Sequence, residues 1–477
     1  MSDNLKKRTL SGLVWQFMER CGAQGVQFII SIVLARLLTP EDFGIIGLLT
    51  VFVTIANVFV EGGFGASLVQ KKGSDETDFS TVFFFSLGFS GILYAVLFFA
   101  APLIASFYNE PILTNMVRVM ALSLFMGAIN TVQKANVSKR MQFKKFFFAT
   151  LSGTVASAIV GISMAYMGFG AWALIGQHLS KQVFDTIVLW FISGWRPKRL
   201  FSFAKLKSLF SFGWKILCSS LIDAIYNNIY SLIIGKFYSS ADLGYYNKGK
   251  SYSYLIIGNI NTSINNVLFP AMSSVQENTD KVKAITRRAI KTSTFIIFPA
   301  MAGLAAIATP LITLMLTEKW LPCVPFLQFC CFSYAFWPVH TANLQAIKAV
   351  GRSDIFLRLE IIKKITGVLI LIVTLPFGLY IMMFGRCVNT ILSSVINAFP
   401  NKKLLNYSCF EQIKDIMPAF LLSVVMLFVV LMVGKLNMNM LLLIIIQIIA
   451  GVLVYILGAK FFKFDALEYC LSIIKRH

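Results

Sequence analysis

The chain has 477 residues, of which 57% are hydrophobic and only 13% are charged. A soluble protein carries roughly 25% charged residues, so this composition does not suit a water-exposed surface. It excludes a soluble enzyme, a secreted domain and a single-pass receptor. The net charge of +22 at pH 7 is spread over connections between apolar runs, so no nucleic-acid partner is predicted.

Apolar runs long enough to cross a membrane follow one another along the whole chain. A transmembrane helix needs about 20 mostly apolar residues, and about 14 such spans can be drawn. The first is interpreted as a retained helix, because no small-residue cleavage site interrupts it. The sequence therefore predicts an all-α polytopic membrane protein. The predicted spans are 12–38, 43–67, 80–106, 113–134, 146–168, 171–194, 208–235, 245–270, 290–316, 323–346, 356–376, 378–399, 416–434 and 440–460.

Basic residues are distributed unevenly between the two sides of this predicted bundle. If the N-terminus lies in the cytoplasm, the outside connections contain only three lysines, which are Lys236, Lys319 and Lys435. The opposite connections hold most of the other lysines and arginines, as the positive-inside rule requires. Both termini are therefore predicted to be cytoplasmic. All connections are short, so no catalytic domain or nucleotide-binding loop is predicted, and the chain is not expected to be an enzyme.

A segment near the start of the chain recurs 200 residues later. Ser31, Asp42 and Gly44 return without a gap as Ser231, Asp242 and Gly244. Six predicted spans separate the equivalent positions, so the two halves share one orientation, as in two-lobed transporters. We expect two pseudo-symmetric six-helix lobes followed by two extra C-terminal helices. The predicted boundaries are 1–200 for the N-terminal lobe, 201–400 for the C-terminal lobe, and 401–477 for the extra helix pair and cytoplasmic tail.

Polar side chains recur at helical spacing on spans 1, 2, 7 and 8, which are equivalent pairs under the repeat. Turning a charged stripe toward lipid is costly, so the stripes should face one another, water or a substrate. They predict a central hydrated cavity. For the Asn, Gln and Ser members, hydrogen bonds from helix to helix remain an alternative. The candidate cavity residues are Arg20, Gln24, Gln27, Lys215, Asn227, Asn261 and Arg386.

The candidate cavity contains more cations than carboxylates. Arg20, Lys215 and Arg386 lie deep within their spans, whereas Lys248 and Lys250 are placed near the outer mouth as solvated residues. A planar guanidinium matches phosphate oxygens in a bidentate manner. The pattern therefore favours an anionic head group over a cationic drug.

Other polar features have plain structural explanations. Lys181 and Asp185 lie four residues apart on span 6 and are predicted to pair on one helix face. The eight cysteines are scattered and form no metal-spaced C-x-x-C pair, so neither a metal site nor a disulfide framework is predicted.

Four short motifs, taken in order, carry a family resemblance. They are Ala-Arg-Leu-Leu-Thr-Pro-Glu-Asp-Phe-Gly at 35–44, Glu-Gly-Gly-Phe-Gly-Ala-Ser-Leu-Val-Gln at 61–70, Leu-Gly-Tyr-Tyr at 243–246 and Leu-Phe-Pro-Ala-Met-Ser at 268–273. Together they resemble the polysaccharide-repeat flippases of the multidrug/oligosaccharidyl-lipid/polysaccharide (MOP) exporter superfamily. The likeness is to the bacterial branch that contains colanic acid and lipopolysaccharide O-unit exporters.

The resemblance implies a two-lobed bundle that moves an undecaprenyl-pyrophosphate-linked oligosaccharide from the cytoplasmic to the periplasmic leaflet of the bacterial inner membrane by alternating access. It implies no cofactor, although coupling to an H⁺ or Na⁺ gradient is suggested for some relatives. For such coupling, Glu61 and Asp223 are the predicted carriers. The implied partners are the lipid-linked oligosaccharide, membrane lipids and other polysaccharide assembly proteins.

Three rival functions remain open from the sequence. A multidrug antiporter of the same superfamily would need a cavity rich in carboxylates and aromatic residues. A lipid-linked glycan polymerase would need a large outside loop, and no predicted connection is long enough. A channel or structural membrane protein would not explain the 200-residue repeat.

Overall fold

The computed structural model describes Trp15 and residues 22–474, and every regular element in these residues is a helix. In this described part, ten helices are long and apolar enough to cross a membrane. The helix Gly22–Leu37 is a shorter apolar one, preceded by residues outside the described part. The protein is therefore an all-α, multi-pass membrane protein, as the composition predicts.

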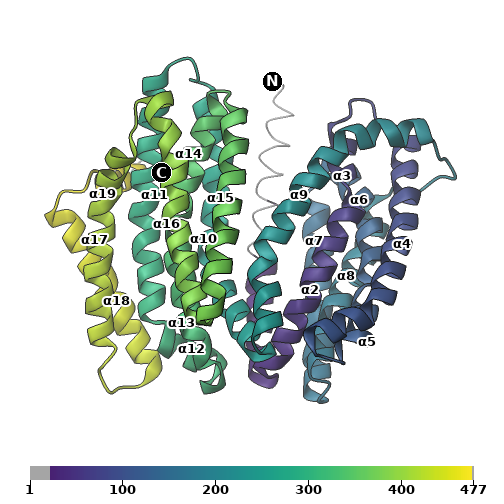
Figure 1. Cartoon of the computed structure of the whole chain (residues 1–477), viewed down its shortest axis with the longest axis horizontal. Helices are drawn as coiled ribbons and strands as arrows, with labels where there is room; N and C mark the ends of the chain where they lie inside the picture. The colour runs from purple at the N-terminus through teal and green to yellow at the C-terminus, as the bar shows by residue number, and fades with distance from the viewer. Residues whose placement is uncertain (1–14, 16–21, 475–477) are drawn as a thin grey trace. The chain divides into compact units, whose positions relative to one another are not determined.

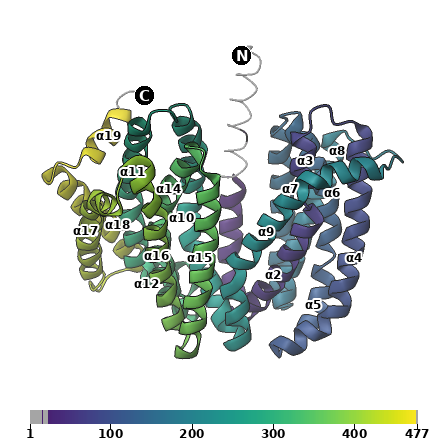
Figure 2. The same ribbon diagram turned by 45° about the horizontal axis from the view of Figure 1, so that its top comes forward.

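The chain divides into two compact units, residues 1–244 and 245–477, whose described parts are coloured purple to teal and teal to yellow in Figures 1 and 2. After Gly22–Leu37, the first unit contains α2 (Pro40–Glu61), α3 (Phe64–Gln70), α4 (Glu76–Tyr108), α5 (Leu113–Met120), α6 (Ser123–Lys139), α7 (Lys144–Tyr166), α8 (Ala171–Ser193) and α9 (Phe203–Phe237). Helix α10 (Ser240–Ser273) begins in the first unit and belongs mostly to the second.

The second unit continues with eleven further elements, two of which are short 3-10 helices. They are α11 (Thr279–Ala306), α12 (Ala308–Leu316), η1 (Glu318–Cys323), α13 (Val324–Ala335), α14 (Trp337–Ala349), α15 (Ser353–Thr374), η2 (Leu375–Phe377), α16 (Leu379–Leu405), α17 (Cys409–Val433), α18 (Met440–Phe461) and α19 (Asp465–Ile474). Helices α8, α10 and α15 cover predicted spans 6, 8 and 11 but are not among the ten membrane-spanning candidates. The count of about 14 crossings therefore stays a prediction.

The repeated segment folds into the same turn twice. Before α2, the Thr39 amide donates to the Asp42 carboxylate over 2.9 Å, and the Asp42 amide donates back to the Thr39 hydroxyl over 3.3 Å. Before α10, Ser239 and Asp242 exchange the same two bonds over 3.2 and 3.1 Å. This reciprocal capping box satisfies amides that would otherwise lack partners, and it starts a helix at both equivalent positions.

Predicted span 2 is broken near its end by two glycines. Gly62 and Gly63 have φ angles of 50° and 71°, so the chain leaves α2 in a left-handed conformation and starts α3. A Cβ on Gly63 would lie 2.4 Å from the carbonyl oxygen of Gly213 in α9. The break therefore lets the α2–α3 turn seat directly on the α9 backbone.

Helix α9 is held by the first unit along its length, and it lies beside α2 in both ribbon views (Figures 1 and 2). The Ser67 hydroxyl of α3 donates to the Leu209 carbonyl of α9 over 3.2 Å. The repeat assigns α9 to the C-terminal lobe, whereas its contacts join it to α2, α3 and α4. The lobe boundaries at 200 and 400 consequently stay predictions from the repeat.

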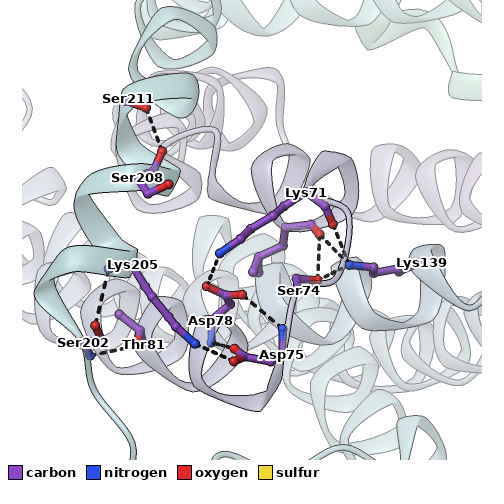
Figure 3. A network of polar contacts seen from close by, with 11 residues as sticks. Lys71, Ser74, Asp75, Asp78, Thr81, Lys139, Ser202, Lys205, Ser208 and Ser211 are labelled. Atoms are coloured by element: carbon purple, nitrogen blue, oxygen red, sulfur yellow. Dashed lines mark hydrogen bonds and ion pairs between the residues drawn. The ribbon is translucent and has the colours of Figure 1, made fainter.

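A polar network fastens the start of α9 to the start of α4 (Figure 3). Lys205 contacts the Asp75 carboxylate at 2.5 Å, and the Ser202 amide donates to the Thr81 hydroxyl over 3.1 Å. The bond from Lys205, followed by the bond from the Asp78 amide, lowers the pKa of Asp75 to about 2. The ion pair with Lys205 therefore persists into acidic pH and is lost only as the pH falls toward the lowered pKa of Asp75.

In the second unit, buried polar contacts tie α17 to its neighbours. Arg287 of α11 binds the Asp415 carboxylate of α17 through two bonds of 2.7 and 2.8 Å. The Gln412 and Asn343 amides exchange hydrogen bonds of 2.8 and 3.0 Å, and Asn401 of α16 donates to Asn343 over 2.6 Å. These contacts anchor α17, the first helix of the predicted extra pair, to α11 and α14 of the same unit.

Candidate substrate-binding surface

The polar stripe predicted on span 7 forms an exposed face of α9. Lys215, Ser219, Asp223 and Asn227 are four residues apart and are all exposed. Since 3.6 residues make one helical turn, these four side chains lie along one side of the helix. A membrane-spanning helix presents such a stripe to water or a polar ligand rather than to lipid. The first unit thus carries a hydrophilic track along α9.

The other candidate residues of the first unit lie in different settings. In the helix Gly22–Leu37, Gln24 is exposed, while Gln27 is half-buried with its Oε1 lacking a hydrogen-bond partner in the described part of the chain. Arg20 lies outside the described residues. Glu61 is exposed at the last position of α2. These residues therefore stay candidates on the basis of the sequence pattern.

The second unit contains a cationic and aromatic cluster that joins α10, α13 and α16. Arg386 of α16 donates to the Tyr246 hydroxyl of α10 over 2.8 Å. Its guanidinium carbon lies 5.6 Å from the centre of the Tyr334 ring, and the Lys250 ammonium lies 5.8 Å from the Tyr246 ring. Cations at this distance from an aromatic face are attracted by the ring quadrupole. The cluster therefore places the side chains of Arg386 and Lys250 beside the aromatic rings of Tyr334 and Tyr246.

Lys248 departs from its predicted solvated position. Its side chain is buried, with 5% of its surface exposed, and its ammonium lies 5.6 Å from the centre of the Trp320 ring. At the next residue, a Cβ on Gly249 would lie only 2.6 Å from the Leu327 amide of α13. The close approach of α10 and α13 encloses Lys248, while Lys250 stays half-buried.

Two further aromatic residues, Tyr254 and Trp337, extend the cluster around Tyr334. Tyr334 and Trp337 stack with ring centres 5.4 Å apart, and Tyr254 lies 5.8 Å from Trp337 and 6.1 Å from Tyr334. Tyr254 is 48% exposed, so one edge of this aromatic group is accessible. Tyr246, Tyr334 and Trp337 were not predicted as site residues from the sequence, although Tyr246 ends the Leu-Gly-Tyr-Tyr motif at 243–246. The sequence signal available for Tyr334 and Trp337 was their three-residue spacing, although the structure places them on two consecutive helices, α13 and α14.

Two candidate polar groups serve helix packing in this structure. Asn261 is buried and accepts a hydrogen bond of 2.7 Å from the Thr341 hydroxyl of α14. The Lys181 ammonium and Asp185 carboxylate of α8 form the predicted ion pair at 2.7 Å. Within Trp15 and residues 22–474, no three His, Cys, Asp or Glu side chains gather as metal ligands. Each unit therefore has its own candidate polar surface, on α9 in the first unit and on α10 and α16 in the second.

The profile of a family described as polysaccharide biosynthesis protein matches residues 33–325, which is more than half of the 477 residues. The chain belongs to this polysaccharide biosynthesis family. The matched region contains Lys215, Asp223 and Lys250, whereas Trp337 and Arg386 lie beyond it. The family match thus covers the α9 stripe and only the α10 side of the cationic and aromatic cluster.

Two individual proteins and one solved structure extend the comparison. The lipopolysaccharide biosynthesis protein WzxC of Escherichia coli (strain K12) is 24% identical over 362 residues, covering 76% of this chain and 74% of WzxC. The succinoglycan biosynthesis transport protein ExoT of Rhizobium meliloti (strain 1021) is 21% identical over 366 residues, covering 76% and 74%. The lipid II flippase MurJ, in an inward closed conformation, matches with a TM-score of 0.78 and 17% identity over 96% of this chain and all of MurJ. The last likeness shows a shared fold.

Proposed function

We propose that this family member moves lipid-linked oligosaccharide repeat units from the cytoplasmic to the periplasmic leaflet of the bacterial inner membrane. The carried molecule is an oligosaccharide joined to undecaprenyl through pyrophosphate, and it supplies surface polysaccharide synthesis. The protein works by alternating access and catalyses no bond rearrangement. Both termini lie in the cytoplasm, because lysines and arginines concentrate in the connections on the same side of the membrane as the termini.

The observation that carries this proposal is the polar, cationic surface on membrane-embedded helices. A hydrated sugar with a charged pyrophosphate cannot enter hydrocarbon without a large desolvation cost. The exposed stripe from Lys215 to Asn227 offers hydrogen-bonding groups along α9. In the second unit, Arg386 and Lys250 offer positive charge beside aromatic rings. Guanidinium and ammonium groups are the natural partners of phosphate oxygens.

The second unit contains an apolar groove that suits the lipid part of the proposed substrate. It has a volume of about 440 Å³ and lies between α11, α17 and α18. Its walls include Pro299, Gly303, Met426, Gly451 and Ile456. A polyprenyl chain needs only apolar contact, so such a groove can hold part of the chain while the head group stays among polar residues.

The membrane potential supplies a driving force for this direction of transport. An inside-negative potential favours outward movement of an anion by about 2.3 kcal/mol per charge for each 100 mV. Ion coupling is therefore an addition that the energetics do not require. If coupling operates, Glu61 and Asp223 are the proposed carriers, since both are exposed carboxylates on membrane-embedded helices of the first unit.

A cation-coupled multidrug antiporter is the second candidate, since it belongs to the same superfamily by resemblance. A cationic drug needs a carboxylate partner, whereas the cluster on α10, α13 and α16 presents Arg386 and Lys250 together with aromatic rings. The charge of this cluster therefore favours the anionic substrate.

The decisive experiment measures the leaflet distribution of undecaprenyl-linked glycan in a strain that lacks the protein, with surface polysaccharide scored in parallel. We expect complete repeat units to accumulate on the cytoplasmic leaflet and surface polymer to disappear. Single units that reach the periplasmic side unpolymerised would instead indicate a polymerase. An unchanged glycan distribution would overturn the proposal and favour the drug exporter.

A further inference from the structure

A second apolar groove lies at the beginning of α17, on a different part of the helix from the groove described above. It has a volume of about 750 Å³. Its lining residues are Phe410, Ile413, Lys414, Met417, Pro418, Leu421, Leu422, Val425, Phe462 and Phe464. Several of these large apolar side chains are strongly exposed, including Phe410 at 77% and Phe462 at 64%. The groove is therefore an apolar surface that is open on the outside of the second unit.

Three lysines lie in or close to the lining of this groove. Lys414 lines it directly, and Lys463 stands between the two lining residues Phe462 and Phe464. Lys460 is exposed one turn earlier on α18. Among the residues that the structure describes, these three lysines form no ion pair. The left-handed backbone at Lys463, with φ of 50°, reverses the chain between α18 and α19 at the edge of the groove.

The neighbouring carboxylates are already occupied by other partners. Asp415 binds Arg287, and Asp465 lies 3.2 Å from the Lys291 ammonium. Glu411 caps α17 by accepting from the Ser408 amide over 2.8 Å. In the described part of this region, Glu468 of α19 is the acidic residue without an ion pair. Three lysines against one free carboxylate leave the rim of the groove positively charged.

From this arrangement we infer that the groove binds an anionic diacyl phospholipid of the phosphatidylglycerol class. The phosphate lies between Lys414 and Lys463 at the polar end of α17. The acyl chains follow the exposed apolar face from Met417 to Val425 toward the middle of the helix. Basic pockets between membrane helices recognise anionic head groups by this combination of charge and apolar contact. The site is independent of the transported substrate.

Native mass spectrometry of the full-length protein in detergent tests the inference. The protein is titrated with phosphatidylglycerol and phosphatidylethanolamine that carry identical acyl chains. For the double variant Lys414→Gln/Lys463→Gln, we expect phosphatidylglycerol to bind about 30-fold more weakly, while phosphatidylethanolamine binding is unchanged. Each single variant should show an intermediate loss. The double variant Lys414→Arg/Lys463→Arg keeps the charges and should retain the preference for the anionic lipid.

Lys435→Gln is the matched control, because Lys435 is also exposed and lies at the opposite end of the α17–α18 pair. It should bind phosphatidylglycerol like the wild type. An unchanged preference in the double glutamine variant, or an equal loss in Lys435→Gln, would overturn the site. Displacement of phosphatidylglycerol by an equal concentration of undecaprenyl phosphate would assign the groove to a polyprenyl lipid instead.

Discussion

Gly44 of α2 and Gly244 of α10 each pack against the main chain of the other helix's first turn. A Cβ on Gly44 would lie 1.7 Å from the Ser240 carbonyl oxygen, and a Cβ on Gly244 would lie 2.0 Å from the Pro40 carbonyl oxygen. The two glycines are equivalent under the 200-residue repeat, and each follows a capping box. The repeated turns therefore contact each other reciprocally, at a distance that only glycine allows.

Replacing either glycine should destabilise the protein. Alanine normally favours a helix over glycine by about 1 kcal/mol, but here the added methyl group would collide with a carbonyl oxygen. We expect Gly44→Ala and Gly244→Ala each to lower the free energy of unfolding by roughly 1–3 kcal/mol, measured from thermal unfolding in detergent. Gly88→Ala in α4 is the control, because nothing lies within 4 Å of its added Cβ. A stabilising effect at Gly44 would contradict the close contact.

The buried carboxylate of Asp415 should be important for holding α17. It accepts two bonds from Arg287 and one of 2.9 Å from the Tyr407 hydroxyl, and only 8% of the residue is exposed. Asp415→Asn removes the charge that Arg287 requires, so we expect a loss of about 1–3 kcal/mol in the free energy of unfolding. Asp354→Asn breaks an ion pair between exposed residues and should change stability little. Equal losses in the two variants would contradict the role of burial.

Arg386 should be required for transport rather than for folding. Its guanidinium is half-buried and is held by Tyr246 and Tyr334. In Arg386→Gln we expect surface polysaccharide to fall by about 10-fold or more, because one charged contact with phosphate is worth at least ~1.5 kcal/mol. Protein level and thermal stability should stay near wild type. Arg140→Gln, which changes an exposed arginine at the end of α6, should leave export intact. Normal export by Arg386→Gln would remove this residue from the substrate path.

Neutralising the two proposed ion carriers separates coupled from potential-driven transport. Glu61→Gln and Asp223→Asn keep the size of each side chain and remove its charge. If either carboxylate carries an ion, export in that variant should lose its dependence on the proton or sodium gradient, measured in vesicles with an imposed gradient. Export that is unchanged in both variants would eliminate Glu61 and Asp223 from the mechanism.

The membrane fold could be predicted from the sequence because apolar runs of sufficient length leave a chain few alternatives to membrane helices. The same was true of the Lys181–Asp185 pair, since four-residue spacing on one helix fixes the contact locally. The stripe on α9 could also be predicted, because a single helix determines which side chains share a face.

Contacts between distant segments could not be read in this way. Lys248 and Lys250 differ by two residues, yet one is buried beside Trp320 and the other is half-buried beside Tyr246. Their difference arises from the close approach of α10 to α13 at Gly249, which no local pattern indicates.

The sequence by itself therefore determined the helical membrane class, the repeated turns and the polarity of each helix face, because these depend on residues a few positions apart. Only the tertiary structure decided that Arg386 meets Tyr246 across 140 residues, and that Asp415 pairs with Arg287 while Lys414, one residue earlier, lines an apolar groove. Adjacent residues on a helix point about 100° apart, so the packing of neighbouring helices selects which one is buried.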